Sequence, residues 1–185
     1  MSHELQPHSD SPPLPVDGLM AEVRRKSSGK LELVYRLSGE LEALLIPELS
    51  NPSRADELWK HTCFEIFILQ AEAPGYVEFN FAPTGQWAAY SFRSRRSGMR
   101  NIEQVGEAPI GTMMFGRQFV LKAELDLSGV EGLPPSGATW RASMSTVIEA
   151  VDGRKAYWAV QHPEGNPDFH APEGFVIDLP APDKG

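Results

Sequence analysis

The chain has a single cysteine, few basic residues and no long apolar run, and each shortage excludes a class of protein. One cysteine in 185 residues allows no disulfide within the chain, so a disulfide-built secreted domain is not expected. Basic residues number 17 against 25 acidic ones, a net charge of -8 that argues against a nucleic-acid partner. No stretch is long enough to cross a bilayer and no signal-peptide pattern is present. We therefore expect a cytoplasmic protein with no membrane partner.

Helical periodicity is also missing, and alternation takes its place. No segment longer than a turn repeats apolar residues at helical spacing with capping residues. Apolar and polar residues alternate instead in short segments separated by turn signals, whereas residues 94–114 have no clear pattern. The segments are 19–24, 31–37, 41–46, 59–69, 76–81, 86–93, 119–127, 140–149, 155–160 and 174–179. Roughly nine to eleven strands of this kind predict an all-β fold, an antiparallel β-sandwich of two packed sheets, with a closed barrel as the alternative.

Composition divides the chain into three parts. Residues 1–17 are rich in Pro, Ser and His and are expected to form an irregular N-terminal arm. Residues 18–180 would form the sandwich domain, which is long enough to bury a core without disulfides or a structural metal. Residues 181–185 would be a C-terminal tail.

The stretch 59–69 carries the most informative pattern. Phe64, Ile66 and Ile68 alternate with a row that holds an indole, an imidazole, a thiol and a carboxylate, namely Trp59, His61, Cys63 and Glu65. Successive side chains of a strand point to opposite faces, so one face enters a core and the other carries this polar row.

The next segment, 76–81, repeats this logic with Glu78 and Asn80 on its polar side. A short connection at 73–75 predicts an antiparallel hairpin, which would bring His61, Glu65, Glu78 and Asn80 onto one sheet face. We take that polar face as the candidate site.

Aromatic rings beside carboxylates and amides suit sugars, which offer flat C–H faces and a rim of hydroxyls. Trp59 and Trp158 are candidates for stacking, and Arg141 is a further polar candidate. The carboxylate pair would also suit a glycosidase. However, the sequence has no nucleophile elbow, phosphate loop or zinc-protease motif, so an enzyme is not expected.

Histidine, cysteine and methionine residues raise the alternatives of a metal site and a haem site. The residues His61, Cys63, His162, Asp168 and His170 have no spacing typical of a metal site, so none is expected. A haem held by a methionine and a histidine is the cofactor alternative. Its candidate ligands are Met99, Met113 or Met114 with His162. The cluster Arg93, Arg95 and Arg96 would suit an anion but is interpreted as solvated surface.

Several of these motifs together resemble the DOMON-like β-sandwiches, a group that includes the family 9 carbohydrate-binding modules. Trp59 is followed six positions later by Glu65, and the closest resemblance is to a bacterial DOMON-like subgroup, over about residues 14–179. The motifs are the runs 58–65, 76–85, 87–90 and 157–159 and the closing segment from His162-Pro163 to Asp168-Phe169-His170.

The resemblance implies a non-catalytic domain that binds a sugar or, as in other DOMON domains, haem. Trp59 and Glu65 match the residues that contact sugar in such relatives, and Trp158 would match a second stacking tryptophan. Lys60 and the three residues after it replace the acidic residues usual there. A protein-interaction module that uses the same face is the remaining alternative.

Overall fold

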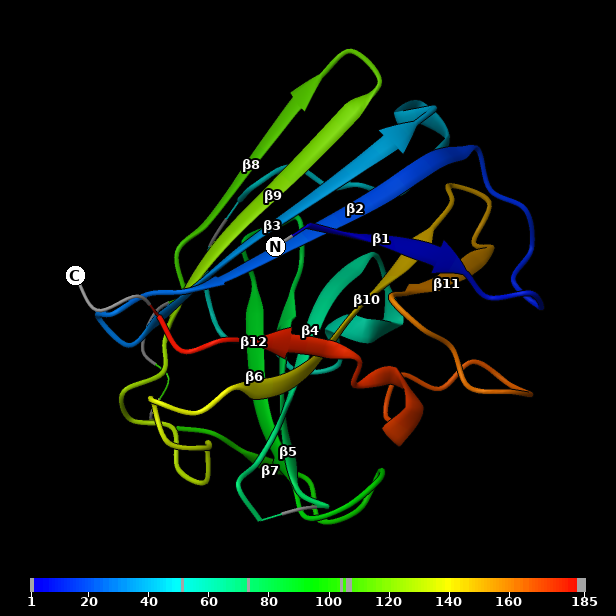
Figure 1. Cartoon of the computed structure of the whole chain (residues 1–185). Helices are drawn as coiled ribbons and strands as arrows, with labels where there is room; N and C mark the ends of the chain where they lie inside the picture. Colours follow the sequence, from blue (N-terminus) through cyan, green and yellow to red (C-terminus); the bar gives the residue numbers. More distant parts are fainter. Residues whose placement is uncertain (1, 51, 73, 104, 106–107, 183–185) are drawn as a thin grey trace.

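The computed structural model describes residues 2–50, 52–72, 74–103, 105 and 108–182, and strands dominate it (Figure 1). The described residues contain no helix with the length and apolarity that a membrane crossing requires. The strands are β1 (Ser2–Pro7), β2 (Val16–Arg25), β3 (Lys30–Gly39), β4 (Cys63–Leu69), β5 (Tyr76–Phe81), β6 (Trp87–Phe92), β7 (Arg100–Asn101), β8 (Ile110–Phe115), β9 (Gln118–Asp126), β10 (Trp140–Glu149), β11 (Lys155–Ala159) and β12 (Ile177–Leu179). Three short 3-10 helices complete the described elements: η1 (Leu41–Ala43), η2 (Leu58–Lys60) and η3 (Pro172–Gly174).

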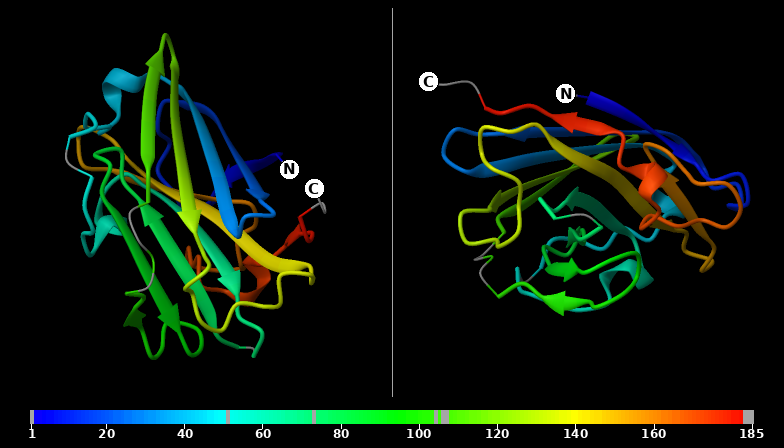
Figure 2. Two further views of the ribbon diagram at one scale, coloured as in Figure 1. Left: turned by 90° about the vertical axis from the view of Figure 1, so that its left-hand side faces the viewer. Right: turned by 60° about the horizontal axis from the view of Figure 1, so that its bottom comes forward.

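The strands form one antiparallel sheet curled into a half-barrel (Figure 2). Their order is β7-β6-β5-β4-β10-β11-β1-β2-β3-β9-β8, and β12 pairs with β10 off this path. Strand β1 pairs with β2 on one side and with β11 on the other, so it joins the two halves of the sheet. The predicted all-β antiparallel character is confirmed, whereas a sandwich of two separate sheets is not.

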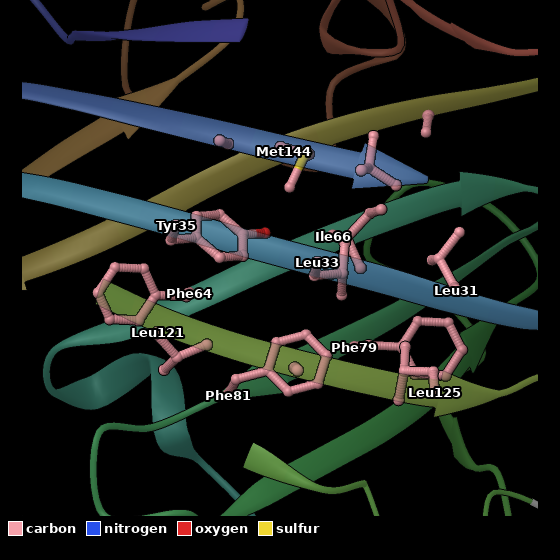
Figure 3. Close-up of a cluster of buried hydrophobic side chains, with 14 of the residues drawn as sticks. Leu31, Leu33, Tyr35, Phe64, Ile66, Phe79, Phe81, Leu121, Leu125 and Met144 are labelled. Atoms are coloured by element: carbon pink, nitrogen blue, oxygen red, sulfur yellow. The ribbon is translucent and has the colours of Figure 1, made fainter. Parts of the chain in front are cut away.

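The main core lies where the two halves of the curled sheet face each other. Alternate residues of β4 point into it, and they meet side chains of β3 and β9 from the other half (Figure 3). Phe64 lies 5.2 Å from Tyr35 and 5.8 Å from Phe119 between ring centroids. The fully buried Tyr35 hydroxyl donates a hydrogen bond to the Glu65 carbonyl oxygen at 2.7 Å and so ties β3 to β4.

Two sequence predictions about the first 50 residues are wrong. The arm 1–17 is not irregular throughout, because residues 2–7 form β1, which buries Leu5. This strand pairs with β2 over residues 2–5 and with β11 over residues 6–7. The predicted strand 41–46 instead forms η1, followed by an isolated bridge between Leu44 and Ala150. An apolar run of this length does not distinguish a strand from a helical turn.

The segment 94–114, which the pattern did not place, contains β7 and most of the edge strand β8. Strand β4 begins at Cys63 and not at Trp59, because residues 58–60 form η2. Residue 73 of the predicted connection and residues 183–185 of the predicted tail lie outside the described residues.

Candidate ligand pocket

The second face of β4, β5 and β6 is covered as well as the first. Almost every residue of these strands is buried, so the side chains that point away from the main core enter a separate apolar cluster. That cluster consists of Leu58, Cys63, Phe67, Tyr76, Ala82, Ala88, Tyr90, Phe92 and Phe175, with Trp59 and Phe169 packed against it. The polar face predicted from the sequence is therefore enclosed by η2 and the loop around η3.

Glu65, Glu78 and Asn80 lie on this enclosed face. The antiparallel register of β4 and β5 places Glu65 opposite Asn80 and Phe67 opposite Glu78, which confirms the predicted hairpin. Because facing residues project to the same side, the three polar side chains come together. Glu65 and Glu78 are only 2% and 3% exposed, and Asn80 is fully buried.

A cavity of about 660 Å³ opens beside the two carboxyl groups, within the size range of small-molecule pockets. Its walls are mostly apolar and include four large aromatic side chains, with one arginine and one histidine added to the glutamates. The lining residues are Trp59, Glu65, Glu78, Phe92, Arg96, Met99, Val147, Tyr157, Pro167, Phe169 and His170. The cavity therefore combines apolar faces with a small number of polar groups.

Each glutamate has one oxygen bonded and one oxygen without a partner. Glu78 Oε1 accepts a hydrogen bond from Asn80 Nδ2 at 2.8 Å, and Glu65 Oε2 accepts one from the Ser145 hydroxyl at 3.4 Å. Glu65 Oε1 and Glu78 Oε2 are buried and find no hydrogen-bond partner among the described residues. Native structures rarely leave such buried oxygens unpaired.

Burial of the two carboxyl groups makes them hard to ionise. Desolvation, and then the nearby charge of Glu78, raises the pKa of Glu65 well above its ordinary value. Desolvation also raises the pKa of Glu78 to about 7. Without a ligand, burial therefore favours the protonated form of each carboxyl group.

Tyr76 connects the strand floor of the cavity to two loops. Its hydroxyl accepts a hydrogen bond from the Arg96 backbone N–H at 3.1 Å and donates one to His170 Nδ1 at 2.7 Å. Burial, and then the charge of Arg96, lowers the pKa of His170 to about 4, so its ring is neutral. His170 Nδ1 lies 3.9 Å from Glu78 Oε2.

Two arginines and an aspartate join the same loops at the rim of the cavity. Arg95 Nε donates to Asp168 Oδ2 at 2.8 Å, and Arg96 Nε donates to Asp168 Oδ1 at 3.0 Å. Arg96 also has a φ of 54°, a left-handed conformation that is costly for a residue with a side chain. The ion pairs and the Tyr76 hydrogen bond hold Arg96 in this conformation.

Replacing Tyr76 by phenylalanine tests this connection. Loss of the hydroxyl leaves the Arg96 N–H and His170 Nδ1 without a partner, so we expect the free energy of unfolding to fall by about 1–3 kcal/mol. Urea denaturation measures the change. The matched control is Tyr157→Phe, because the Tyr157 hydroxyl makes no hydrogen bond with any described residue. Equal stability of the two variants would contradict the proposed role of the hydroxyl.

The structure brings together some of the predicted site residues and separates others. Trp59, Glu65 and Glu78 line the cavity, and Asn80 holds Glu78. His61 is outside the cavity: its side chain is 70% exposed, and Nδ1 lies 2.7 Å from Glu149 Oε2.

Arg141 and Trp158 also lie elsewhere. Arg141 donates to the Phe175 carbonyl oxygen and pairs with Asp178, and Trp158 packs into the main core. Tyr157 lines the cavity in its place, because neighbouring residues of β11 point to opposite faces.

Sequence reasoning missed the loop residues of the site. The sequence offers His170 as a metal ligand and as part of the closing segment of the resemblance, and Arg96 as solvated surface or part of an anion site. In the structure both residues line the cavity. The described residues contain no group of three or more His, Cys, Asp or Glu that could hold a metal ion.

The half-barrel defines an all-β protein whose fold is similar to that of two solved structures. A candidate carbohydrate-binding protein from Bacteroides uniformis is similar with a TM-score of 0.65 and 15% identity, over 94% of this chain and 84% of that one. A family 9 carbohydrate-binding module from Caldicellulosiruptor kristjanssonii, solved with glucose, gives a TM-score of 0.50 and 11% identity, over 98% of this chain and 87% of that one. No protein-family model and no curated protein matches the sequence. At such low identity the two likenesses show the fold.

Proposed function

We propose that this chain binds a carbohydrate in the 660 Å³ cavity beside β4 and β5 and does not transform it. The observation that carries the proposal is the pair of buried carboxyl groups, each with an unpartnered oxygen, within a wall that is mostly apolar and partly aromatic. Two structural neighbours support it: one is a candidate carbohydrate-binding protein and the other is a module solved with glucose. Kinship with the bacterial DOMON-like domains is part of the same proposal.

The cavity matches the two chemical aspects of a sugar. Phe92, Tyr157 and Phe169 supply apolar surface for the C–H face of a ring, and Trp59 lies beside them. The carboxyl pair supplies both hydrogen-bond acceptors and, in its protonated form, a donor for neighbouring hydroxyls. A sugar would thus give the unpartnered oxygens the hydrogen bonds that the protein does not.

Hydrolysis of a glycosidic bond is disfavoured by the same electrostatics. A retaining or inverting glycosidase needs one carboxyl group protonated and the other ionised. Here no cation is paired directly with either glutamate among the described residues, and the pKa of both groups is raised. Burial therefore opposes the ionised carboxylate that either mechanism needs, although Arg96 at the cavity acts in the other direction.

The haem alternative gains no support from the candidate ligands. His162 Nε2 lies 2.9 Å from the Gln6 carbonyl oxygen and donates a hydrogen bond to it. Met99 lines the cavity, but His162 does not, and Met113 and Met114 are 62% and 53% exposed on the edge strand β8 outside it.

Titration of the protein with a panel of neutral and charged saccharides tests the proposal. We expect tryptophan fluorescence to change on binding, and thermal stability to rise because the ligand binds only the folded state. Trp59→Ala should weaken binding at least about tenfold, as the loss of about 1.4 kcal/mol of ring contact implies. Met113→Ala, on exposed β8, is the control and should bind as the wild type does. A wild-type protein that responds to no saccharide would overturn the proposal, and released reducing sugar would overturn its non-catalytic part.

A further inference from the structure

We propose that the saccharide carries a protonated amine and that its ammonium group binds between Glu65 and Glu78. This inference rests on the proposed function and names the ligand class of the same pocket. The feature that calls for it is a buried acidic pair at the cavity wall with two oxygens that no described residue satisfies.

The charge of Arg96 lowers the pKa of both glutamates after desolvation has raised it, but Arg96 forms its ion pair with Asp168 and not with either glutamate. The nearest arginine at the cavity, Arg96, directs its Nε and Nη2 at Asp168 Oδ1, at 3.0 and 2.9 Å. His170 is neutral, and its Nδ1 already accepts a hydrogen bond from the Tyr76 hydroxyl. Burial of two carboxyl groups without a cation is costly, so the site as it stands favours a positive ligand.

The other titratable groups around the pair add no net charge that would offset the two carboxyl groups. Burial raises the pKa of the Cys63 thiol well above its ordinary value and the pKa of Tyr76 to about 12, so both are neutral. Asp168 at the rim is offset by Arg95 and Arg96 together. If both glutamates ionise, the site carries a net negative charge.

An ammonium group meets this requirement better than a hydroxyl group. It has three N–H donors and a full positive charge, whereas a hydroxyl has one donor and no charge. With an ammonium between them, both glutamates can ionise, and any proton that they retain in the free protein is released to solvent. The bonds formed are N–H···O hydrogen bonds, and no covalent step is involved.

The surroundings of the pair also favour a cation. Trp59, Phe92, Tyr157 and Phe169 line the cavity, and the faces of aromatic rings attract positive charge. The whole chain carries a net charge of -8, which favours the approach of cations. An anionic sugar would instead face two carboxyl groups, while the one arginine in the wall is occupied by Asp168.

Isothermal titration with matched sugars separates charge from ring shape. Glucosamine, galactosamine and mannosamine are each compared with the parent sugar and with the N-acetyl derivative, in which the amine has lost its charge. We expect at least one amine to bind about tenfold tighter than both of its relatives near neutral pH, a difference of about 1.4 kcal/mol. Repeating the titration in buffers of different ionisation enthalpy should show proton release with the amine and none with the parent sugar.

Substitution of the acidic pair assigns the effect to this site. Glu65→Gln and Glu78→Gln should reduce the ratio of the amine's affinity to the parent sugar's affinity to about twofold or less. The affinity for the parent sugar itself should change less. Glu4→Gln, an exposed carboxylate on β1, should leave the advantage intact. Circular dichroism confirms that each variant is folded.

The outcomes distinguish this inference from the proposed function. If a parent sugar binds as tightly as its amine, the inference is overturned and carbohydrate binding stands. If ethanolamine, which has no ring, binds as tightly as the amino sugars, the saccharide part of the inference is overturned. If neither amines nor neutral saccharides bind, both proposals are overturned.

Discussion

Replacing Glu78 by glutamine should stabilise the unliganded protein at mildly alkaline pH, by about 3 kcal/mol if the full difference in pKa is expressed. Burial raises the pKa of Glu78 from its ordinary value of 4.5 to about 7, so ionisation is harder in the folded state than in the unfolded state. Glutamine keeps the oxygen that accepts the Asn80 hydrogen bond and removes the charge. The expected sign is opposite to that of most substitutions at a buried position.

The pH dependence of this effect follows from linkage. Below the unfolded-state pKa, Glu78 is protonated in both states and ionisation contributes nothing. As the pH rises from 4.5 to about 7, the unfolded state loses its proton first, so the free energy of unfolding of the wild type falls. Above about 7 both states are ionised, and the folded state carries the full cost of the buried charge. Glu65, whose pKa is also raised, acts in the same direction.

Urea denaturation of wild type and Glu78→Gln at several pH values between about 5 and about 8 measures this difference. The two curves should converge at the acidic end and separate as the pH rises. Glu4→Gln, on an exposed stretch of β1, should follow the wild type at every pH. A wild type whose stability is constant over this range, or a Glu78→Gln variant that is less stable at alkaline pH, would contradict the prediction.

The stability cost of Glu65 and Glu78 is itself an argument for function. A strand buried on both faces normally carries an unbroken apolar sequence, and an apolar residue at either position would remove the cost. Side chains that break a local rule without compensation in the free protein are typical of binding sites. The two glutamates interrupt the apolar pattern of β4 and β5, and the ligand proposed for the pocket would explain why they do.

The hairpin at the centre of the fold could be predicted because its information is local. Alternation in residues 63–69 and 76–81 fixes which side chains share a face, and the register confirms that Glu65, Glu78 and Asn80 do so. The strands β2, β3, β9 and β10 were predicted nearly at their observed limits for the same reason. The alternation of apolar and polar residues alone does not predict how these strands curl into a half-barrel.

The enclosure of the site could not be predicted, because it depends on contacts between distant residues. Tyr76 and His170 are 94 residues apart, and Arg96 and Asp168 are 72 residues apart. Alternation placed Glu65 and Glu78 on one face but left open whether that face meets solvent or a loop. The late aromatic was misplaced by one position, since Tyr157 and not Trp158 lines the cavity.

Phe64→Ala should lower the free energy of unfolding by about 3–5 kcal/mol, the usual cost of truncating a buried phenylalanine. Phe64 is fully buried and contacts Tyr35 and Phe119, so the cavity left behind would lie between the two halves of the curled sheet. That loss is a large part of the stability of an ordinary domain. The matched control is Phe115→Ala, because Phe115 is 81% exposed on β8 and its truncation should change stability by less than about 0.5 kcal/mol.

The same variant also separates the stability of the core from the chemistry of the pocket. Phe64 and Glu65 are adjacent on β4 and point to opposite faces, so truncation of the ring removes core contacts without removing a group from the cavity wall. At a temperature where Phe64→Ala is fully folded, its affinity for a saccharide should match the wild type, whereas that of Glu65→Gln for an amino sugar should not. A Phe64→Ala variant as stable as the wild type would mean that the two halves are not held together by this core.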